Sequence, residues 1–227
     1  MIIVFDLDDT LYEELTFVKS GFVAVADFLE CNFGISSSES YELMVNRLEL
    51  GRGKIFDDTL SHFGVLHKQT VDRCLTVYRK HFPKIQLHQE AEDFLVRFAH
   101  EPLYIVTDGN KMVQNNKIIA LGLRKHVKHV FITHRYGVKH AKPSPYCFQK
   151  ICEIEKVEPR EVVYVGDNPH KDFVGIKPLG FQTIRINQGS FKNVKVTNDY
   201  EAHSTIGSLR ELTIELLESL DSKECRK

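Results

Sequence analysis

The residues most suited to chemistry lie in the first ten positions of the chain. Residues 6–10 read DLDDT and follow directly after the apolar run IIVF at 2–5. Side chains two apart along a strand point the same way, so Asp6 and Asp8 are expected on one side, at the carboxyl end of a short strand. Because like charges this close repel, the pair suggests a bound cation, a shared proton or a reaction.

Polar groups also follow three later apolar runs. They are Thr107, Asp108 and Gly109 after 103–106, Lys142 and Pro143 after 129–132, and Asp167 with Asp172 after 162–165. In a parallel sheet, ligands bind beyond the carboxyl ends of the strands, so we expect these groups to meet there.

The types of these residues suit phosphate chemistry. A carboxylate can act as a nucleophile and form an aspartyl-phosphate, and a second carboxylate can give and take protons. Mg²⁺ takes oxygen ligands, which Asp6 and Asp167 can supply. The Thr107 hydroxyl and the next two backbone N–H groups, at the entry to a helix, can bind an anion. Lys142 can balance the charge of a nucleophile and a phosphate.

The elements that would position these groups fall into two regions. Residues 13–87 read as helices without a convincing strand, whereas from residue 88 apolar runs alternate with helical segments. We expect strands at 2–5, 103–106, 129–132, 162–165 and 183–186, and helices at 90–100, 111–121, 145–155, 171–179 and 208–220. Such strands, separated by helices, predict an α/β fold with a doubly wound parallel sheet. We therefore expect an α/β core formed by 1–12 and 88–227, and an inserted helical cap at 13–87.

The composition argues against several classes of protein. With 42% hydrophobic and 27% charged residues among 227, an ordinary globular protein is expected. A formal net charge of −1 gives no general affinity for nucleic acid polymers, and no apolar stretch approaches the roughly 20 residues that span a bilayer. The start lacks the features of a signal peptide. The five cysteines include no C-x-x-C pair, so we expect reduced thiols and a cytoplasmic location.

Taken in order, the polar segments resemble the four motifs of the haloacid dehalogenase superfamily of phosphohydrolases. The D-x-D-x-T motif matches residues 6–10, and the Thr or Ser at a strand end matches Thr107. The Lys before Pro matches Lys142, and the acidic G-D-x-x-x-x-D motif matches residues 166–172.

The resemblance extends over 1–12 and 88–190, whereas 13–87 is similar only as a helical insertion. The stretches NNKIIALGL at 115–123 and KPSPYCF at 142–148 resemble the small phosphatases of the superfamily, which include nucleotidases and sugar phosphatases. The resemblance thus implies Mg²⁺-dependent hydrolysis of a small phosphorylated metabolite, either a nucleoside monophosphate or a sugar phosphate.

The resemblance also implies roles for the residues that match the motifs. Asp6 would attack phosphorus and form an aspartyl-phosphate. Asp8 would protonate the leaving group and then activate water. Thr107 and Lys142 would hold the phosphoryl group.

A magnesium site is implied by the same motifs. Asp6, the backbone carbonyl of Asp8 and Asp167 would ligate the ion, and Asp172 would either lie behind these ligands or orient the motif lysine. One departure is Asp108, where many relatives carry Asn. Its carboxylate adds negative charge beside a phosphate site, so its backbone N–H is the better candidate for binding.

Other activities of the superfamily stay open at this point. A phosphomutase would use the same residues but pass the phosphoryl group to a substrate. A dehalogenase needs neither Mg²⁺ nor an acid at position 8, so Asp8 argues against it. A non-catalytic binding module would commonly have lost the nucleophile or an acid, and both are retained here. The metabolite, the cap residues that select it and the oligomeric state are not determined by the sequence.

Two further polar segments have plain structural explanations. Asp9 is expected to cap a helix or to be solvated. The sequence GRGK at 51–54 is expected to be a solvated loop between helices, although its two basic residues suit an anionic substrate.

Overall fold

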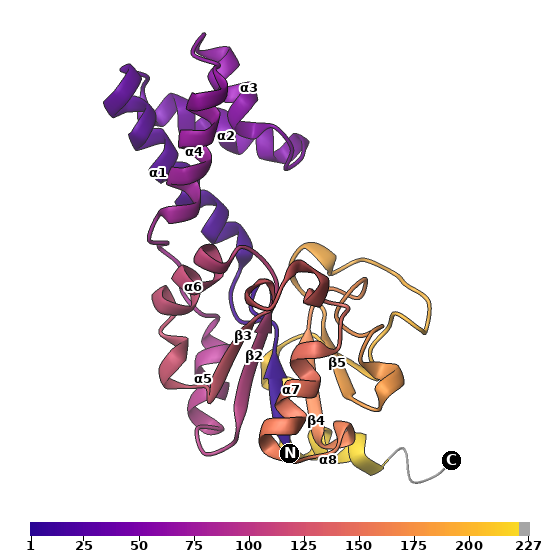
Figure 1. Cartoon of the computed structure of the whole chain (residues 1–227). Coiled ribbons are helices and arrows are strands. Elements are labelled where there is room, and N and C mark those ends of the chain that lie inside the picture. The colour runs from indigo at the N-terminus through magenta and orange to yellow at the C-terminus, as the bar shows by residue number, and fades with distance from the viewer. Residues whose placement is uncertain (223–227) are drawn as a thin grey trace. The chain divides into compact units, whose positions relative to one another are not determined.

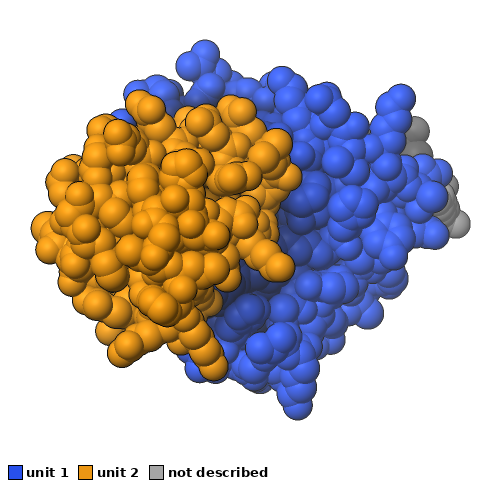
Figure 2. Space-filling view, turned by 90° about the horizontal axis from the view of Figure 1, so that it is seen from above, with its two compact units in different colours: residues 1–14, 86–227 blue, residues 15–85 orange. Residues whose placement is uncertain are grey.

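The computed structural model describes residues 1–222 (Figure 1). The chain forms two compact units, which Figure 2 colours separately: Met1–Glu14 with Gln86–Lys227, and Leu15–Ile85. That the second unit acts as a cap stays a prediction, and Cys225 lies outside the described residues. None of the helices within residues 1–222 has the length and apolar character needed to cross a membrane.

The first unit is built on a parallel sheet, which within residues 1–222 has six strands. They are β1 (Ile2–Phe5), β2 (Leu103–Thr107), β3 (His129–Ile132), β4 (Val162–Gly166), β5 (Gln182–Ile186) and β6 (Ser204–Ile206), in the spatial order β3-β2-β1-β4-β5-β6. The chain moves outward from β1 to β3 and then returns to β4 on the other side of β1. The order therefore reverses between β1 and β4, where such sheets bind ligands. The predicted doubly wound parallel sheet is confirmed.

Both faces of the sheet are covered by helices, which explains why the central strands β1, β2 and β4 are buried along their whole length. The helices of this unit are α5 (Gln89–Arg97), α6 (Lys111–Ala120), α7 (Tyr146–Glu155) and α8 (Ile214–Ser222). On one face, Val4 and Tyr164 share a buried cluster with Phe148 of α7. On the other, Phe5 packs edge to face on Phe94 of α5, with ring centroids 5.3 Å apart.

The predicted helix at 171–179 is wrong. Only residues 177–179 form a single 3₁₀ turn there. A Cβ at Gly175 would overlap the carbonyl of Pro143, so this segment lies directly against the loop after β3. The Asp172 carboxylate also accepts a hydrogen bond from a backbone N–H of its own loop, at 2.9 Å. These contacts hold the segment in an irregular loop beside the site.

The C-terminal elements also differ from expectation. The strand β6 was not predicted, because three residues are too few to show an alternating pattern. The last helix begins at Ile214 rather than at Ser208. A 3₁₀ turn, capped by the Ser208 side chain, comes before it.

The second unit is helical, as predicted. Its helices are α1 (Glu14–Phe33), α2 (Ser37–Leu50), α3 (Ile55–His62) and α4 (Lys68–Lys80). The core is aromatic: Phe22 and Phe56 pack on Tyr78, with centroids 6.2 Å and 5.6 Å from that ring. A Cβ at Gly21 would overlap the Tyr78 ring, so glycine allows α1 and α4 to approach closely.

Candidate active site

Polar groups that follow three strands meet at the carboxyl edge of the sheet. Phe5 pairs with Ile105 of β2 and with Val165 of β4. The backbone N–H of Asp6 then donates to the Val165 carbonyl at 2.8 Å. The segments after β1, β2 and β4 therefore begin side by side.

Lys142, from the loop after β3, lies at the centre of this edge. Its Nζ contacts the carboxylates of Asp6 at 2.7 Å and Asp172 at 2.8 Å, and it donates to the Tyr164 hydroxyl at 2.8 Å. The side chain is 1% exposed. Burial disfavours a charged amine, but Asp172 and Asp6 outweigh this and hold the pKa of Lys142 well above its usual value. The site thus contains a permanent buried cation.

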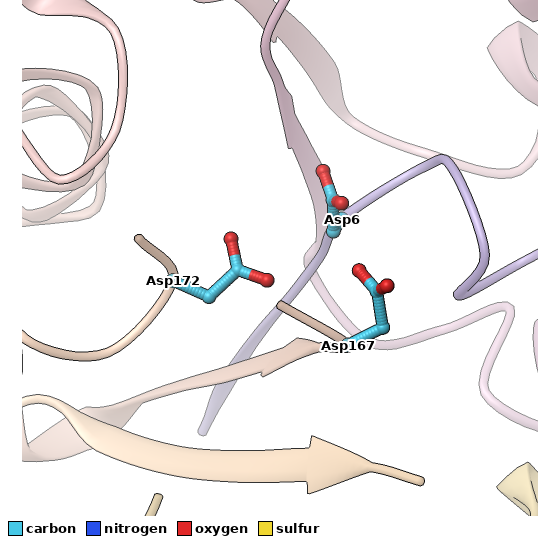
Figure 3. Close-up of side chains that lie close together, drawn as sticks. All are labelled: Asp6, Asp167 and Asp172. Atoms are coloured by element: carbon cyan, nitrogen blue, oxygen red, sulfur yellow. The ribbon is translucent and has the colours of Figure 1, made fainter. Parts of the chain in front are cut away.

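Three buried carboxylates lie together: Asp6, Asp167 and Asp172 (Figure 3). One oxygen of each lies within 4.8 Å of the others. Burial raises the pKa of Asp6 to about 6, although Lys142 opposes the shift. Burial, together with the charges of Asp6 and Asp172, raises the pKa of Asp167 to about 9. Within residues 1–222, Asp167 forms no hydrogen bond or ion pair.

The charge and chemistry of this cluster fit a divalent cation. Three carboxyl groups face one lysine, so the cluster holds two more acidic groups than cationic ones. Carboxylate oxygens are the ligands that Mg²⁺ prefers. The oxygens of Asp172 already have partners, because Oδ1 contacts Lys142 and Oδ2 accepts from the Asn168 N–H at 2.9 Å. Asp6 and Asp167 are therefore the better placed ligands.

Asp8 contacts a different set of side chains. β1 ends before it, and a turn with φ of 52° at Asp9 follows, so strand alternation does not set its direction. The Oδ1 of Asp8 lies 2.6 Å from the Nζ of Lys117, and its Oδ2 accepts from the Nε2 of Gln114 at 2.8 Å. Burial would raise the pKa of Asp8, but Lys117 and the hydrogen bonds bring it below its usual value.

Asp108 braces the loops around the site. Its Oδ1 accepts from the Thr133 hydroxyl at 2.7 Å and from the backbone N–H of Lys142 at 3.1 Å, and its Oδ2 lies 3.4 Å from the Nζ of Lys171. Burial would raise the pKa of Asp108, but the two lysines and these bonds hold it below its usual value. Asp108, which stands where many relatives carry Asn, thus has its negative charge paired with Lys171.

Candidate groups for binding an anion lie between β2 and α6. Within residues 1–222, the backbone N–H groups of Asp108 and Gly109 donate to no acceptor, and Asn110 caps the first turn of α6. The Thr107 hydroxyl accepts from the Nε2 of Gln114 at 2.6 Å. Its own proton is therefore available to an incoming oxygen.

Asp9 has a structural position. It is 7% exposed, and its carboxylate accepts from the N–H of Glu14, the first residue of α1, at 2.9 Å, and from the N–H of Ser190 at 3.0 Å. It thus ties Glu14 to the loop after β5, and all three residues belong to the first unit. The helix-cap interpretation holds, whereas the solvated one is wrong.

Sequence reasoning missed several residues that touch the predicted groups, among them Gln114, Lys117 and Lys171. Gln114 and Lys117 are three apart and thus share one face of α6. A lysine and a glutamine facing inward on the helix after Thr107 were the available signal, but periodicity alone does not tell which face is buried.

Comparisons with known proteins agree with this fold. A sequence model of the haloacid dehalogenase-like hydrolases matches residues 1–180. The chain belongs to this family of enzymes.

Its relatives are named phosphatases. A glyceraldehyde 3-phosphate phosphatase of Methanocaldococcus jannaschii is 29% identical, over 92% of this chain and 94% of its own length. An N-acylneuraminate-9-phosphatase of Rattus norvegicus is 24% identical, over 97% and 95%. Among solved structures, a HAD phosphatase from Thermococcus onnurineus has a TM-score of 0.59 and 27% identity, over 95% of this chain and 97% of its own. The prediction of a phosphatase of this superfamily is confirmed.

Proposed function

We propose that this chain is a Mg²⁺-dependent phosphomonoesterase that acts on a small phosphorylated metabolite through an aspartyl-phosphate. One observation carries the proposal: the Asp6 carboxylate lies 2.7 Å from a buried lysine and inside a cluster that holds two more acidic groups than cationic ones. A nucleophile, a phosphate-binding cation and a place for a divalent metal ion therefore share one sheet edge.

The proposed reaction has two steps. An Asp6 oxygen attacks phosphorus, the bond to the leaving oxygen breaks, and that oxygen takes a proton from Asp8. Water then attacks phosphorus and gives a proton back to Asp8, and the bond to Asp6 breaks. Lys142, the Thr107 hydroxyl and the two N–H groups without acceptors hold the phosphoryl oxygens.

The protonation states support these roles. With a pKa of about 6, Asp6 is mostly a carboxylate at neutral pH, as a nucleophile must be. The lowered pKa of Asp8 favours the base form needed for the second step. An incoming phosphate brings negative charge beside Asp8 and so favours the acid form needed for the first step.

We place the metal ion against Asp6 and Asp167, with the Asp8 carbonyl as a further ligand. When bound, Mg²⁺ neutralises charge on the phosphoryl oxygens. Asp172 would orient two groups: its Oδ1 contacts Lys142, and its Oδ2 accepts from the backbone N–H of Asn168.

The relatives support a small polar phosphate ester as substrate. The names glyceraldehyde 3-phosphate phosphatase, phosphoserine phosphatase and N-acylneuraminate-9-phosphatase have this chemistry in common. A sugar or sugar-acid phosphate is thus favoured over a nucleoside monophosphate. Cys31, Cys74, Cys147 and Cys152 are free thiols, which suits the reducing cytoplasm.

The test is a phosphate-release assay with Mg²⁺ on 4-nitrophenyl phosphate and a panel of phosphorylated metabolites. We expect turnover by the native chain, none by Asp6→Asn, and native rates for Asp199→Asn, which replaces an exposed aspartate. Turnover by Asp6→Asn would overturn the role of Asp6. If the native chain releases no phosphate from any compound, the proposed phosphomonoesterase function is wrong. Phosphoryl transfer between sugars without release of inorganic phosphate would identify a phosphomutase.

A further inference from the structure

Three side chains surround the carboxylate of Asp8, and we call them the Asp8 clamp: Tyr12, Gln114 and Lys117. The Nζ of Lys117 lies 2.6 Å from Oδ1, to which the Tyr12 hydroxyl also donates. Gln114 donates to Oδ2 at 2.8 Å. Two members of the clamp come from one face of α6, so a single helix fixes both oxygens of Asp8.

Lys117 is buried as the partner of Asp8, and stability alone does not explain why a protein would bury such a pair. Its side chain is 4% exposed, and a lysine is almost never fully buried unless it is paired. A buried ion pair is often no more stabilising than well-packed apolar residues of similar volume. The lysine at this position is therefore better explained by what it does to Asp8.

Gln114 connects Asp8 to the phosphate site. Its Nε2 donates to Oδ2 of Asp8 and, at 2.6 Å, to the hydroxyl of Thr107. Gly109 packs closely against this side chain: a Cβ added to the glycine would lie 3.3 Å from the Gln114 side chain. One amide thus sets the distance between the hydroxyl that holds phosphate and the carboxylate that moves a proton.

The clamp leaves one carboxylate oxygen able to react. A carboxylate oxygen accepts about two hydrogen bonds. Oδ1 of Asp8 already accepts from Lys117 and Tyr12, whereas among residues 1–222 Oδ2 accepts only from Gln114. Because the side chain of Asp8 is 25% exposed, Oδ2 can face a substrate.

We infer that Lys117 and Gln114 are positioning residues, which hold Asp8 so that proton transfer to and from the substrate occurs at Oδ2. This inference rests on the proposed role of Asp8 as acid and base. A misplacement of about 1 Å in a reacting group can lower a rate about 100-fold, so loss of the clamp should impair the step that needs the proton.

The experiment compares two leaving groups of similar size. 4-Nitrophenolate departs without a proton, whereas the alkoxide from benzyl phosphate must be protonated. We would measure kcat/KM with Mg²⁺, since it reports only the steps up to departure of the leaving group. The variants are Lys117→Met, Gln114→Met and, as a reference, Asp8→Asn. Lys111→Met, at an exposed position of the same helix, is the matched control.

We expect Lys117→Met to lose about 100-fold with benzyl phosphate and little with 4-nitrophenyl phosphate. Asp8→Asn should show the same selectivity, and Lys111→Met none. If kcat/KM falls equally with both substrates, the role of Lys117 is structural only and the inference is overturned. The inference is also overturned if kcat/KM does not fall with either substrate. If Lys117→Met does not fold, Gln114→Met decides by the same criterion.

The two levels of the argument fail differently. If Asp8→Asn is selective and the clamp variants are not, the clamp inference is wrong and the proposed function stands. If the native chain hydrolyses neither ester, or if Asp8→Asn shows no selectivity, the proposed role of Asp8 is itself wrong.

Discussion

Asp167→Asn should stabilise the protein when no metal ion is bound. Asp167 is buried beside Asp6 and Asp172, and the one lysine of the cluster contacts those two carboxylates instead. Asparagine has the same shape as aspartate but carries no charge. The substitution thus removes a carboxyl group that burial and its acidic neighbours keep protonated in the metal-free protein, and it also removes a proposed metal ligand.

The magnitude follows from the pKa of Asp167, which rises from 3.8 to about 9. Between these values the folded protein binds a proton that the unfolded chain does not, so its stability falls as the pH rises. At about 1.4 kcal/mol per pH unit, the penalty approaches about 2 kcal/mol at pH 5 and about 4 kcal/mol at pH 7. Asparagine escapes this penalty. For a chain of this length, each kcal/mol corresponds to about 2–4 °C in Tm.

The assay is thermal unfolding followed by circular dichroism in EDTA, at pH 5 and pH 7, with Asp199→Asn as the control. We expect Asp167→Asn to melt about 8–16 °C above the native chain at pH 7, with a smaller gap at pH 5. Millimolar Mg²⁺ should then raise the Tm of the native chain more than that of the variant. A variant that is no more stable than the native chain in EDTA, or a gap that does not change with pH, would refute the reasoning.

Three other substitutions test the contacts around the site. Lys142→Met leaves two buried carboxylates without their cation, so it should lower the free energy of unfolding by about 3–5 kcal/mol in urea and abolish phosphate release. Asp108→Asn removes only a partly exposed ion pair, so stability in urea should change by less than about 1 kcal/mol; a larger loss would mean that the pair organises the loops. Gly189→Ala should destabilise by about 1–3 kcal/mol, because φ is 64° and the new Cβ would overlap Asp9. Gly34→Ala is its control, since that glycine has a similar φ of 67° and open space around it, and equal losses would show that only backbone strain matters.

The fold was largely predictable because its signals are local. The run IIVF at 2–5 and the later apolar runs are each long enough to identify a buried strand, and the structure has strands at each of them. The helix expected at 171–179 failed for a non-local reason: Gly175 packs on Pro143, which is far away in sequence. Helical propensity cannot report such a contact.

The candidate site divides in the same way. Asp6, Lys142 and Asp167 were identified from the sequence because each follows an apolar strand, and Thr107 because it ends one. Parallel strands end at one edge. Gln114 and Lys117, the partners of Asp8 on α6, were not identified from the sequence, because their contact with Asp8 depends on which face of α6 turns inward.

The sequence by itself therefore determined which chemical groups gather at the edge of the sheet. Only the tertiary structure decided how they pair: Lys142 with Asp6 and Asp172, Lys117 with Asp8, Lys171 with Asp108, and Asp167 with no side chain among residues 1–222. The physical reason is the separation along the sequence of the residues that interact. Strand formation depends on neighbouring residues, whereas an ion pair depends on a few ångströms between side chains that can be more than a hundred residues apart.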